Sequence, residues 1–304
     1  MVRNVRRMSA SLRVGVVALL AAASAACTPL GVFATFTPRD PALLTARSQS
    51  YGALGRQTLD VYAPRQISAA RPVAVFLYGG GWERGRKWDY GWVAQALAAR
   101  GFVVVLPDYR LYPQVRFPEF LNDSAQAVRW AVDHAGAYGG DPSRIVLLGH
   151  SAGAYNAVML GLDPSYLRQA GVDPARIAGI VGIAGPYDFL PLEGHMADVF
   201  GVGDPAGTQP VRLANPNAPP MLLITGDADT IVDPRDTDAL GQAMRAAGGR
   251  VETRSYPGVG HNEIMAAISR PFRDRASVLD DISGFMEQAV DAPSAHAFVT
   301  NRTP

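Results

Sequence analysis

Five near-continuous apolar runs, separated by stretches with helical spacing, constrain the fold of this chain more than any other feature. A strand that is buried on both faces has such a run, whereas a helix that covers a sheet has apolar residues every three or four positions. The apolar runs are Val73–Tyr78, Phe102–Leu106, Ile145–Leu148, Ile177–Ala184 and Met221–Thr225. The helical stretches are Tyr90–Arg100, Pro118–Ala135, Ala152–Leu162 and Arg235–Ala247.

This alternation predicts an α/β fold in which helices cover both faces of a doubly wound, mostly parallel sheet. A further strand at Val251–Tyr256 and an antiparallel pair near Ser48–Leu54 and Thr58–Tyr62 bring the expected sheet to about eight strands. The alternation breaks at residues 186–220, where Gly, Pro and Asp accumulate. Because structureless loops beyond about 15 residues are uncommon in compact domains, we expect a small cap there rather than an ordinary long loop.

Composition excludes several classes of function. Apolar residues make up 48% of the 304 positions and charged residues 18%, which is enough for a sizeable core and too little charge for a disordered chain. With 28 basic and 27 acidic side chains the formal charge is only +1, so we expect a small-molecule substrate and no nucleic-acid partner. The folded domain is expected at residues 48–290, followed by a disordered tail at 291–304.

The first residues have the pattern of an export signal. Arginines 3, 6, 7 and 13 precede the apolar run Val14–Ala23, which at ten residues is too short to cross a bilayer. We therefore expect residues 1–26 to be a signal peptide and residues 28–47 to be a tether. Cys27, the only cysteine, follows Ser24-Ala25-Ala26, where bacterial lipoproteins carry the acylated thiol; an ordinary Ala-x-Ala cleavage is the alternative. The expected location is outside the cytoplasm, either anchored to a membrane through this lipid or as a periplasmic or secreted protein.

A candidate nucleophile lies where an apolar run meets a helical stretch. Gly149-His150-Ser151-Ala152-Gly153 matches G-x-S-x-G, directly follows the run IVLL and opens the stretch AGAYNAVML. This strand-turn-helix context is the one in which the motif exposes a serine hydroxyl. We expect Ser151 to be a nucleophile, and the alternative is a glycine-rich turn.

A serine nucleophile needs a base and an acid that orients it. Of the histidines at 134, 150, 195, 261 and 296, only His261 follows the last strand pattern, so we expect it to be the base. His195 lies in the cap and either contacts substrate or has a structural role. Asp229 follows the run MLLIT and precedes His261, which is the chain order Ser, Asp, His, so we expect it to be the acid. Asp227 and Asp233 are the structural alternatives, with Asp233 ahead of Pro234 as a helix cap.

Backbone donors and aromatic side chains complete the expected site. Tyr78-Gly79-Gly80-Gly81-Trp82 follows the run VAVFL, and its glycines allow the main chain to approach a developing oxyanion. Tyr78, Trp82 and Tyr187 are candidate pocket residues, and Trp88 and Trp92 are expected near the same mouth. No metal-ligand spacing, phosphate loop or nucleotide fingerprint accompanies these motifs, so we expect no metal and no cofactor.

Together these motifs resemble the α/β-hydrolase family, and within it the carboxylesterases with an HGGGW-type loop that are related to hormone-sensitive lipase. The run from the glycine loop to GHSAGAY is also similar to the prenylcysteine methylesterase-like branch and, less closely, to kynurenine formamidase. The matching segments are YGGGW at Tyr78, PDYRLYP at Pro107, AYGGDPSRI at Ala137, GHSAG at Gly149, GPYDFLPL at Gly185, GDADTIV at Gly226 and GVGHNE at Gly258.

The resemblance implies an α/β-hydrolase fold over residues 48–290, an ester-cleaving activity, and oxyanion donors at the backbone N–H groups of Gly80, Gly81 and Ala152. Tyr78 replaces the histidine that usually precedes the glycines, which puts the hydrogen bonds that organise this loop in question. Three functions remain open: a hydrolase of short-chain or small aryl or alkyl carboxylic esters, an amide- or formamide-cleaving enzyme or peptidase on the same triad, and a non-catalytic binding protein. The presence of Ser151, Asp229 and His261 disfavours the last.

Overall fold

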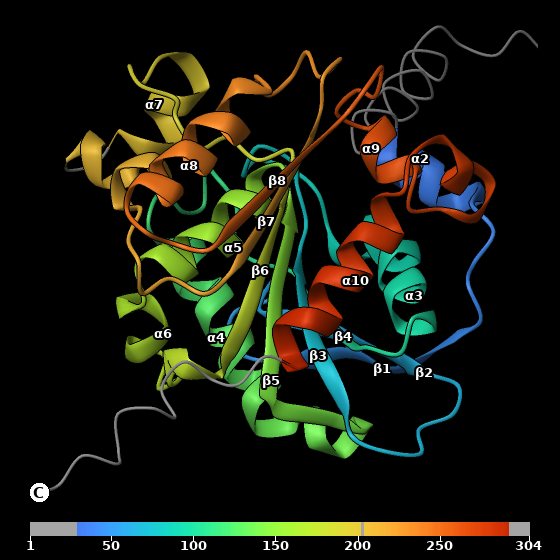
Figure 1. Ribbon diagram of the computed structural model, residues 1–304. Coiled ribbons are helices and arrows are strands. Elements are labelled where there is room, and N and C mark those ends of the chain that lie inside the picture. Colours follow the sequence, from blue (N-terminus) through green and yellow to red (C-terminus); the bar gives the residue numbers. More distant parts are fainter. Residues whose placement is uncertain (1–28, 202–203, 292–304) are drawn as a thin grey trace, which may run out of the picture.

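A single eight-stranded sheet organises the molecule, whose computed structural model describes residues 29–201 and 204–291 (Figure 1). The strand order is β1-β2-β4-β3-β5-β6-β7-β8; β1 and β2 are antiparallel to their neighbours, and β3 to β8 are mutually parallel. The strands are β1 Ala42–Ser50, β2 Thr58–Pro64, β3 Arg71–Leu77, β4 Val103–Pro107, β5 Gly140–His150, β6 Ile177–Ile183, β7 Met221–Gly226 and β8 Val251–Tyr256. The predicted α/β-hydrolase sheet of about eight strands is confirmed.

Helices cover both faces of this sheet. The α-helices are α2 Pro29–Phe36, α3 Gly91–Ala99, α4 Glu119–His134, α5 Ala152–Leu162, α6 Ser165–Gln169, α7 Gly194–Phe200, α8 Arg235–Ala246, α9 Glu263–Ala266 and α10 Val278–Asp291. The 3-10 helices are η1 Lys87–Tyr90, η2 Ala135–Tyr138, η3 Pro174–Arg176, η4 Pro205–Thr208, η5 Pro210–Leu213 and η6 Arg270–Arg275. The four helices expected from apolar spacing are all present, with ends within one residue of the expected ones.

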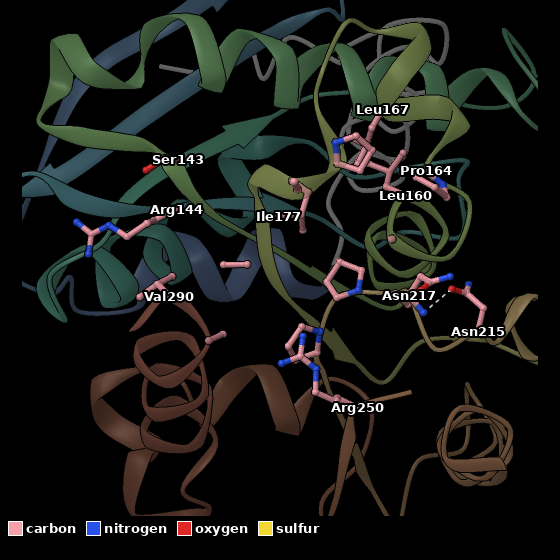
Figure 2. A pocket seen from close by; sticks show the side chains of 18 of the residues that line it. Ser143, Arg144, Leu160, Pro164, Leu167, Ile177, Asn215, Asn217, Arg250 and Val290 are labelled. Carbon is pink, nitrogen blue, oxygen red and sulfur yellow. Dashed lines mark hydrogen bonds between the residues drawn. The ribbon is translucent and has the colours of Figure 1, made fainter. Parts of the chain in front are cut away.

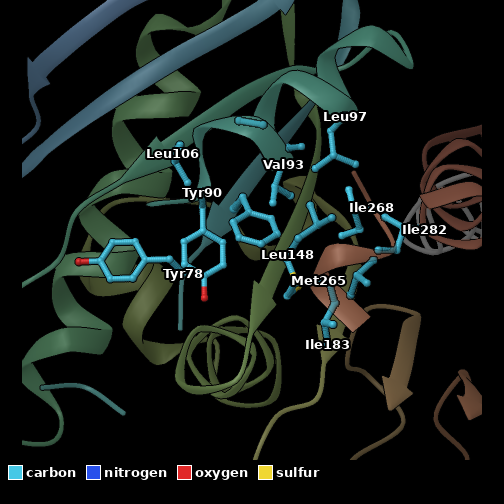
Figure 3. Close-up of a cluster of buried hydrophobic side chains, with 14 of the residues drawn as sticks. Tyr78, Tyr90, Val93, Leu97, Leu106, Leu148, Ile183, Met265, Ile268 and Ile282 are labelled. Carbon is cyan, nitrogen blue, oxygen red and sulfur yellow. The ribbon is translucent and has the colours of Figure 1, made fainter. Parts of the chain in front are cut away.

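The apolar runs supply side chains to both faces because successive residues of a strand point to opposite sides. In β3, Val73 and Val75 pack with α4, α5 and α8 in one buried cluster, whereas Ala74 and Phe76 belong to the other cluster. That second cluster includes side chains of α3 and α10, and Figure 3 shows its part around Tyr78 and Tyr90. No strand from β3 to β7 has a face left for solvent, which accounts for their continuous apolar sequence.

The N-terminal part of the fold differs from the expectation. The first strand was expected at Ser48–Leu54, but β1 spans Ala42–Ser50, and Leu54 lies 44% exposed in the turn that leads to β2. The expected tether at 28–47 was also wrong over its described part, because α2 packs on the domain through buried Leu30 and Ala34. Apolar residues of α2 and the first residues of β1 gain burial by this packing, whereas a tether would expose them.

Three further expectations concern the chain ends. The signal peptide at 1–26 and the acylation site Cys27 lie outside the described residues, as do residues 292–304 of the expected tail. Asp291, the first residue of that tail, is the last residue of α10, a helix that was not expected. Among residues 29–201 and 204–291, none of the helices has the length and apolar character needed to cross a membrane.

The loop after β4 is held by a buried ion pair. Asp123 of α4 is fully buried and accepts hydrogen bonds from the backbone N–H and the guanidinium of Arg110 and from the Gln57 amide. These contacts connect α4 to the turn before β2 and to the loop after β4. Removing the carboxylate would leave the Arg110 backbone N–H without its acceptor and would leave the guanidinium only its pair with Glu119.

We predict that Asp123→Ala lowers the free energy of unfolding by about 1–3 kcal/mol, because it leaves donors of Arg110 and Gln57 without their buried acceptor while Arg110 keeps only its pair with Glu119. Asp133→Ala is the matched control on the same helix, since its pair with Arg129 is exposed and should contribute less than about 0.5 kcal/mol. Urea unfolding at neutral pH measures both values. Equal losses in the two variants would contradict the structural role given to Asp123.

Candidate active site

Ser151 occupies a sharp turn between β5 and α5. Its backbone angles are φ 54° and ψ −123°, a conformation that costs a non-glycine residue about 1–3 kcal/mol. The Ser151 N–H donates to the carbonyl of Ile183 at 2.8 Å, which ties the turn to the neighbouring strand β6. The strained turn raises the side chain above the carboxyl end of the sheet.

The two glycines of the motif are required for steric reasons. A Cβ atom at Gly149 would lie 2.1 Å from the carbonyl oxygen of Gly153, and one at Gly153 would lie 2.1 Å from the carbonyl oxygen of Leu77 in β3. No side chain fits at either position because α5 crosses so close to β5 and β3. The G-x-S-x-G spacing therefore follows from the packing of this helix on the sheet.

His261 and Asp229 form a buried pair. His261 Nδ1 lies 2.7 Å from Asp229 Oδ2, and each residue is only 7% exposed. Burial acts to raise the pKa of Asp229, but hydrogen bonds from His261 and from the backbone N–H groups of Val232 and Ile231 outweigh it and hold the pKa below its usual value. The ionised carboxylate of Asp229 accepts a hydrogen bond from the Nδ1–H of His261. The other ring nitrogen, Nε2, is then left as an acceptor.

The other two aspartates of this loop have different partners. Asp227 accepts the backbone N–H of Gly258 at 2.6 Å. Asp233 accepts the backbone N–H of Arg235, the first residue of α8, and pairs with its guanidinium at the surface. Neither forms a hydrogen bond with His261. The contacts of Asp227 and Asp233 therefore match the structural role that was expected as the alternative to catalysis.

One cavity of about 600 Å³ brings most of the expected site residues together. Ser151, His261, Gly80, Gly81 and Ala152 all line it, and Asp229 lies behind His261. The N–H groups of Gly80 and Gly81 form no hydrogen bond with any described residue, and Ala152 is the first residue of α5, whose N–H has no partner within the helix. Three backbone donors are therefore available beside the serine.

The glycine loop owes its shape to residues without a Cβ. Gly80 has φ +140° and Gly81 has φ +61°, and a Cβ at Gly80 would lie 2.1 Å from the carbonyl oxygen of Arg84. Trp82 follows with φ +59°, and its indole Nε1–H donates to Asn156 Oδ1 at 3.0 Å. Trp82 lines the cavity, as expected for a pocket residue.

Two other pocket expectations were wrong. Tyr78 is fully buried below the glycine loop, where its ring stacks on Tyr109 with centroids 4.6 Å apart and its hydroxyl accepts from Arg56 at 2.6 Å. Tyr187 is also fully buried, with its hydroxyl against the backbone at Gly182. Neither lines the cavity, because both rings fill space between the sheet and the loops.

Tyr78 also answers the question raised by the missing histidine. The Tyr109 hydroxyl donates to the carbonyl of Tyr78 at 2.6 Å, and Arg56 donates both to the Tyr78 hydroxyl and to the carbonyl of Gly85. Burial raises the pKa of Tyr78 far above its usual value, so the phenol stays neutral. An arginine and a second tyrosine thus organise the start of the glycine loop.

Sequence reasoning missed a role for His150, which it treated as the variable position of the motif. His150 is buried with Nδ1 2.9 Å from the Tyr90 hydroxyl and Nε2 3.2 Å from the carbonyl oxygen of His261. The Tyr90 hydroxyl in turn accepts the N–H of Gly79 at 3.3 Å. Burial, followed by the proximity of His261, lowers the pKa of His150 far below its usual value.

A single assignment of protons satisfies all of these hydrogen bonds. A neutral His150 donates from Nε2 to His261 O, accepts at Nδ1 from Tyr90, and leaves the Tyr90 oxygen to accept from Gly79. The chain of hydrogen bonds connects the glycine loop to the backbone of the histidine loop. No sequence signal identifies it, because Tyr90 lies in a 3-10 helix 60 positions before His150.

The expected cap at 186–220 contains α7, η4 and η5 and contacts the glycine loop. His195 of α7 lines the cavity and donates from Nε2 to the carbonyl oxygen of Gly81 at 2.6 Å, while its Nδ1 lies 3.0 Å from Glu83 Oε1. His195 therefore has a structural contact and access to the cavity. His134 lies outside the cavity, with Nδ1 bonded to the Trp130 carbonyl, and His296 lies outside the described residues.

A second hollow is separate from this site (Figure 2). It has a volume of about 430 Å³ and lies at the opposite edge of the sheet, against Ile177 at the start of β6 and Pro220 just before β7. None of the expected site residues lines it. Within the described ranges, His, Cys, Asp and Glu side chains form no group of three or more that could hold a metal ion.

Comparisons with known proteins agree with this geometry. The sequence model of the BD-FAE family matches residues 59–244, which run from β2 into α8 and include Ser151 and Asp229. The chain is 29% identical to a probable isoprenylcysteine alpha-carbonyl methylesterase of Oryza sativa over 78% of this chain and 61% of that protein. It is 31% identical to carboxylesterase NlhH of Mycobacterium tuberculosis over 74% of this chain and 76% of that protein.

A solved structure, a truncated carbohydrate esterase from gut microbiota, has the same fold with a TM-score of 0.71 at 20% identity, covering 84% of this chain and 99% of that one. The chain spans only 61% and 60% of the length of two plant methylesterases that it matches. The family match and the 31% identical relative indicate the same family, and the solved structure shares the fold. The chain belongs to the BD-FAE family of α/β-hydrolase esterases.

Proposed function

We propose that this protein hydrolyses carboxylic esters through an acyl-enzyme, with Ser151 as nucleophile, His261 as base and Asp229 as the acid that orients His261. One observation carries the proposal: Ser151, on its strained turn, and His261 line the same cavity, and His261 contacts Asp229 at 2.7 Å behind it. The names of the relatives, methylesterase and carboxylesterase, support ester cleavage. No contact in the cavity favours an amide or formamide substrate instead.

The reaction follows from the available donors and acceptors. Nε2 of His261 accepts the hydroxyl proton as Ser151 Oγ attacks the ester carbonyl carbon. The N–H groups of Gly80, Gly81 and Ala152 stabilise the negative charge that develops on the carbonyl oxygen. His261 then gives the proton to the departing alkoxide. A water molecule, deprotonated by the same nitrogen, attacks the acyl carbon, and His261 returns this proton to Ser151 Oγ as the bond to the acyl group breaks and the carboxylic acid leaves.

The cavity favours a short acyl group. Its volume of about 600 Å³ lies within the range of small-molecule sites, and apolar side chains of Leu30, Phe189, Met196 and Ile231 contribute to its walls. The cap contributes Phe189, Met196 and His195 to the lining, and His195 also contacts Gly81 of the glycine loop. We therefore propose short-chain or small aryl or alkyl esters as substrates.

For the triad, we expect Ser151→Ala and His261→Ala each to lower kcat by about 10⁶, because the members act as one unit. Asp229→Asn should lower kcat by about 10⁴, since His261 loses the partner that fixes its tautomer. Asp227→Asn and Asp233→Asn are controls that should change kcat little. Initial rates on p-nitrophenyl butyrate, with circular dichroism as a check on folding, measure these effects. A severe loss in Asp233→Asn would mean that another carboxylate acts on His261.

For chain length, we expect kcat/KM to be highest for acetyl to butyryl p-nitrophenyl esters and to fall before eight carbons. Each methylene that the cavity accepts gains about 0.8 kcal/mol, and the gain ends where the cap closes the space. Rates on acetate, butyrate, octanoate and palmitate esters test this, with the matching anilides and a formanilide alongside. A preference for palmitate would refute the short pocket, and faster anilide than ester turnover would favour the amidase alternative.

We also propose that the protein is exported and acylated on Cys27, on the basis of the signal pattern in residues 1–26. Wild type should fractionate with membranes. Cys27→Ser should abolish incorporation of a labelled fatty acid, because acylation requires the thiol. Metabolic labelling with an alkynyl fatty acid measures this directly, and equal labelling of both forms would contradict acylation at Cys27.

A further inference from the structure

Large apolar side chains are exposed on the elements that contribute residues to the active-site cavity, α2, η1 and the loop after β7. Phe36 is 82% exposed and Val32 49% exposed, and their spacing of four residues places them on one face of α2. Ile231 is 66% exposed and lines the cavity from the loop after β7. Trp88 is 44% exposed in η1, which packs against α2. We call these four side chains the apolar rim.

The opposite face of α2 fixes the helix beside the cavity. Leu30 lines the cavity, Ala34 is fully buried, and the ring of Phe33 packs against Trp92 at 5.3 Å and against Phe272 at 6.0 Å. Leu30 of α2 and Asn262, the residue before α9, line the same cavity. Because its inner face is already packed, the exposed position of Phe36 and Val32 is built into the fold.

Arginines surround the α2 side of the rim. On residues 29–40, 83–89 and 270–275, the exposed charged side chains are Arg39, Arg84, Arg86, Arg270 and Arg275 against the acids Glu83 and Asp274. The Arg86 guanidinium lies over the Trp88 ring, and Arg270 donates to the carbonyl of Arg39. Exposed aromatic and aliphatic side chains with arginines beside them are the composition that binds the interface of an anionic bilayer.

The proposed acylation site is close to α2 in the sequence. Three peptide units separate Cys27 from Leu30, so their Cα atoms can be at most about 11 Å apart. An acyl chain on Cys27 would therefore enter a bilayer next to the cavity mouth. One acyl chain gives only marginal membrane binding, and a second apolar or basic contact is what makes such binding stable.

We propose that the apolar rim lies on the surface of an anionic lipid bilayer, so that the active-site cavity opens toward the membrane. This inference rests on the proposed ester hydrolysis and names its substrate class: amphiphilic esters whose short acyl group enters the cavity while a long alcohol chain stays in the lipid. The bilayer presents the ester bond at headgroup depth, which is where the rim places the cavity.

The test uses the purified protein with the N-terminus that the cell produces, on phosphatidylglycerol vesicles that contain hexadecyl butyrate. Val32→Ser/Phe36→Ser should lower turnover of this ester about tenfold, because it removes apolar area from the contact, and should leave turnover of soluble p-nitrophenyl butyrate within about twofold. Ile67→Ser is the matched control: Ile67 is 40% exposed and lies against Gly139, at the opposite edge of the sheet. Equal vesicle turnover in all three proteins would overturn the proposal.

Brominated phosphatidylglycerol gives a readout that does not depend on catalysis. Trp88 is 44% exposed, whereas Trp82, Trp92 and Trp130 are buried, so quenching of the protein fluorescence by bromine should be lost in Trp88→Phe and weakened in Val32→Ser/Phe36→Ser. Quenching without any Ser151-dependent turnover would refute the proposed function and leave the membrane face standing. Absent quenching with normal soluble turnover would refute the face alone, as would a dimer in light scattering that Val32→Ser/Phe36→Ser dissociates.

Discussion

The close crossing of α5 over β5 and β3 is the contact on which the rest of this site depends. Gly149 and Gly153 allow it, and the strained backbone of Ser151 is its direct result. The strain of about 1–3 kcal/mol persists because the turn is held from both sides, by the helix packed on the sheet and by the hydrogen bond from Ser151 to Ile183. Any side chain at Gly153 would push α5 away from Leu77 and release the serine from its position.

The loops that serve this serine are held relative to one another by buried polar groups. The chain from Gly79 through Tyr90 and His150 to the His261 carbonyl spans the glycine loop and the histidine loop. All its members are buried, so a lost partner would leave a desolvated polar group, which costs about 1–3 kcal/mol. That penalty favours one geometry of the two loops and so fixes the oxyanion donors relative to the base before substrate binds.

Local sequence patterns predicted the sheet and the cavity residues. The prediction failed where the position of a side chain depends on tertiary packing. A strand that is buried on both faces has a continuous apolar run, and the nucleophilic turn has a serine between Gly149 and Gly153. Both signals can be read without knowing which residues pack against them. Tyr78 and Tyr187 have the same aromatic character whether they line a cavity or fill a core, so their burial was not predictable. The α2 helix was missed because so short an apolar segment gains its structure only from contacts with residues far along the chain, among them Trp92 and Phe272.

The position of α2 has a consequence for the energetics of the N-terminus. A helix of eight residues is not stable alone in water, so α2 exists because Leu30 and Ala34 are buried against the domain and the partly buried Phe33 packs beside them. That packing fixes the direction in which Phe36 points, and with it the orientation of the cavity relative to anything attached upstream. With the proposed acylation at Cys27, a flexible tether would let the domain tumble at a membrane surface, whereas the packed α2 would restrict it to orientations in which the cavity mouth is near the lipid.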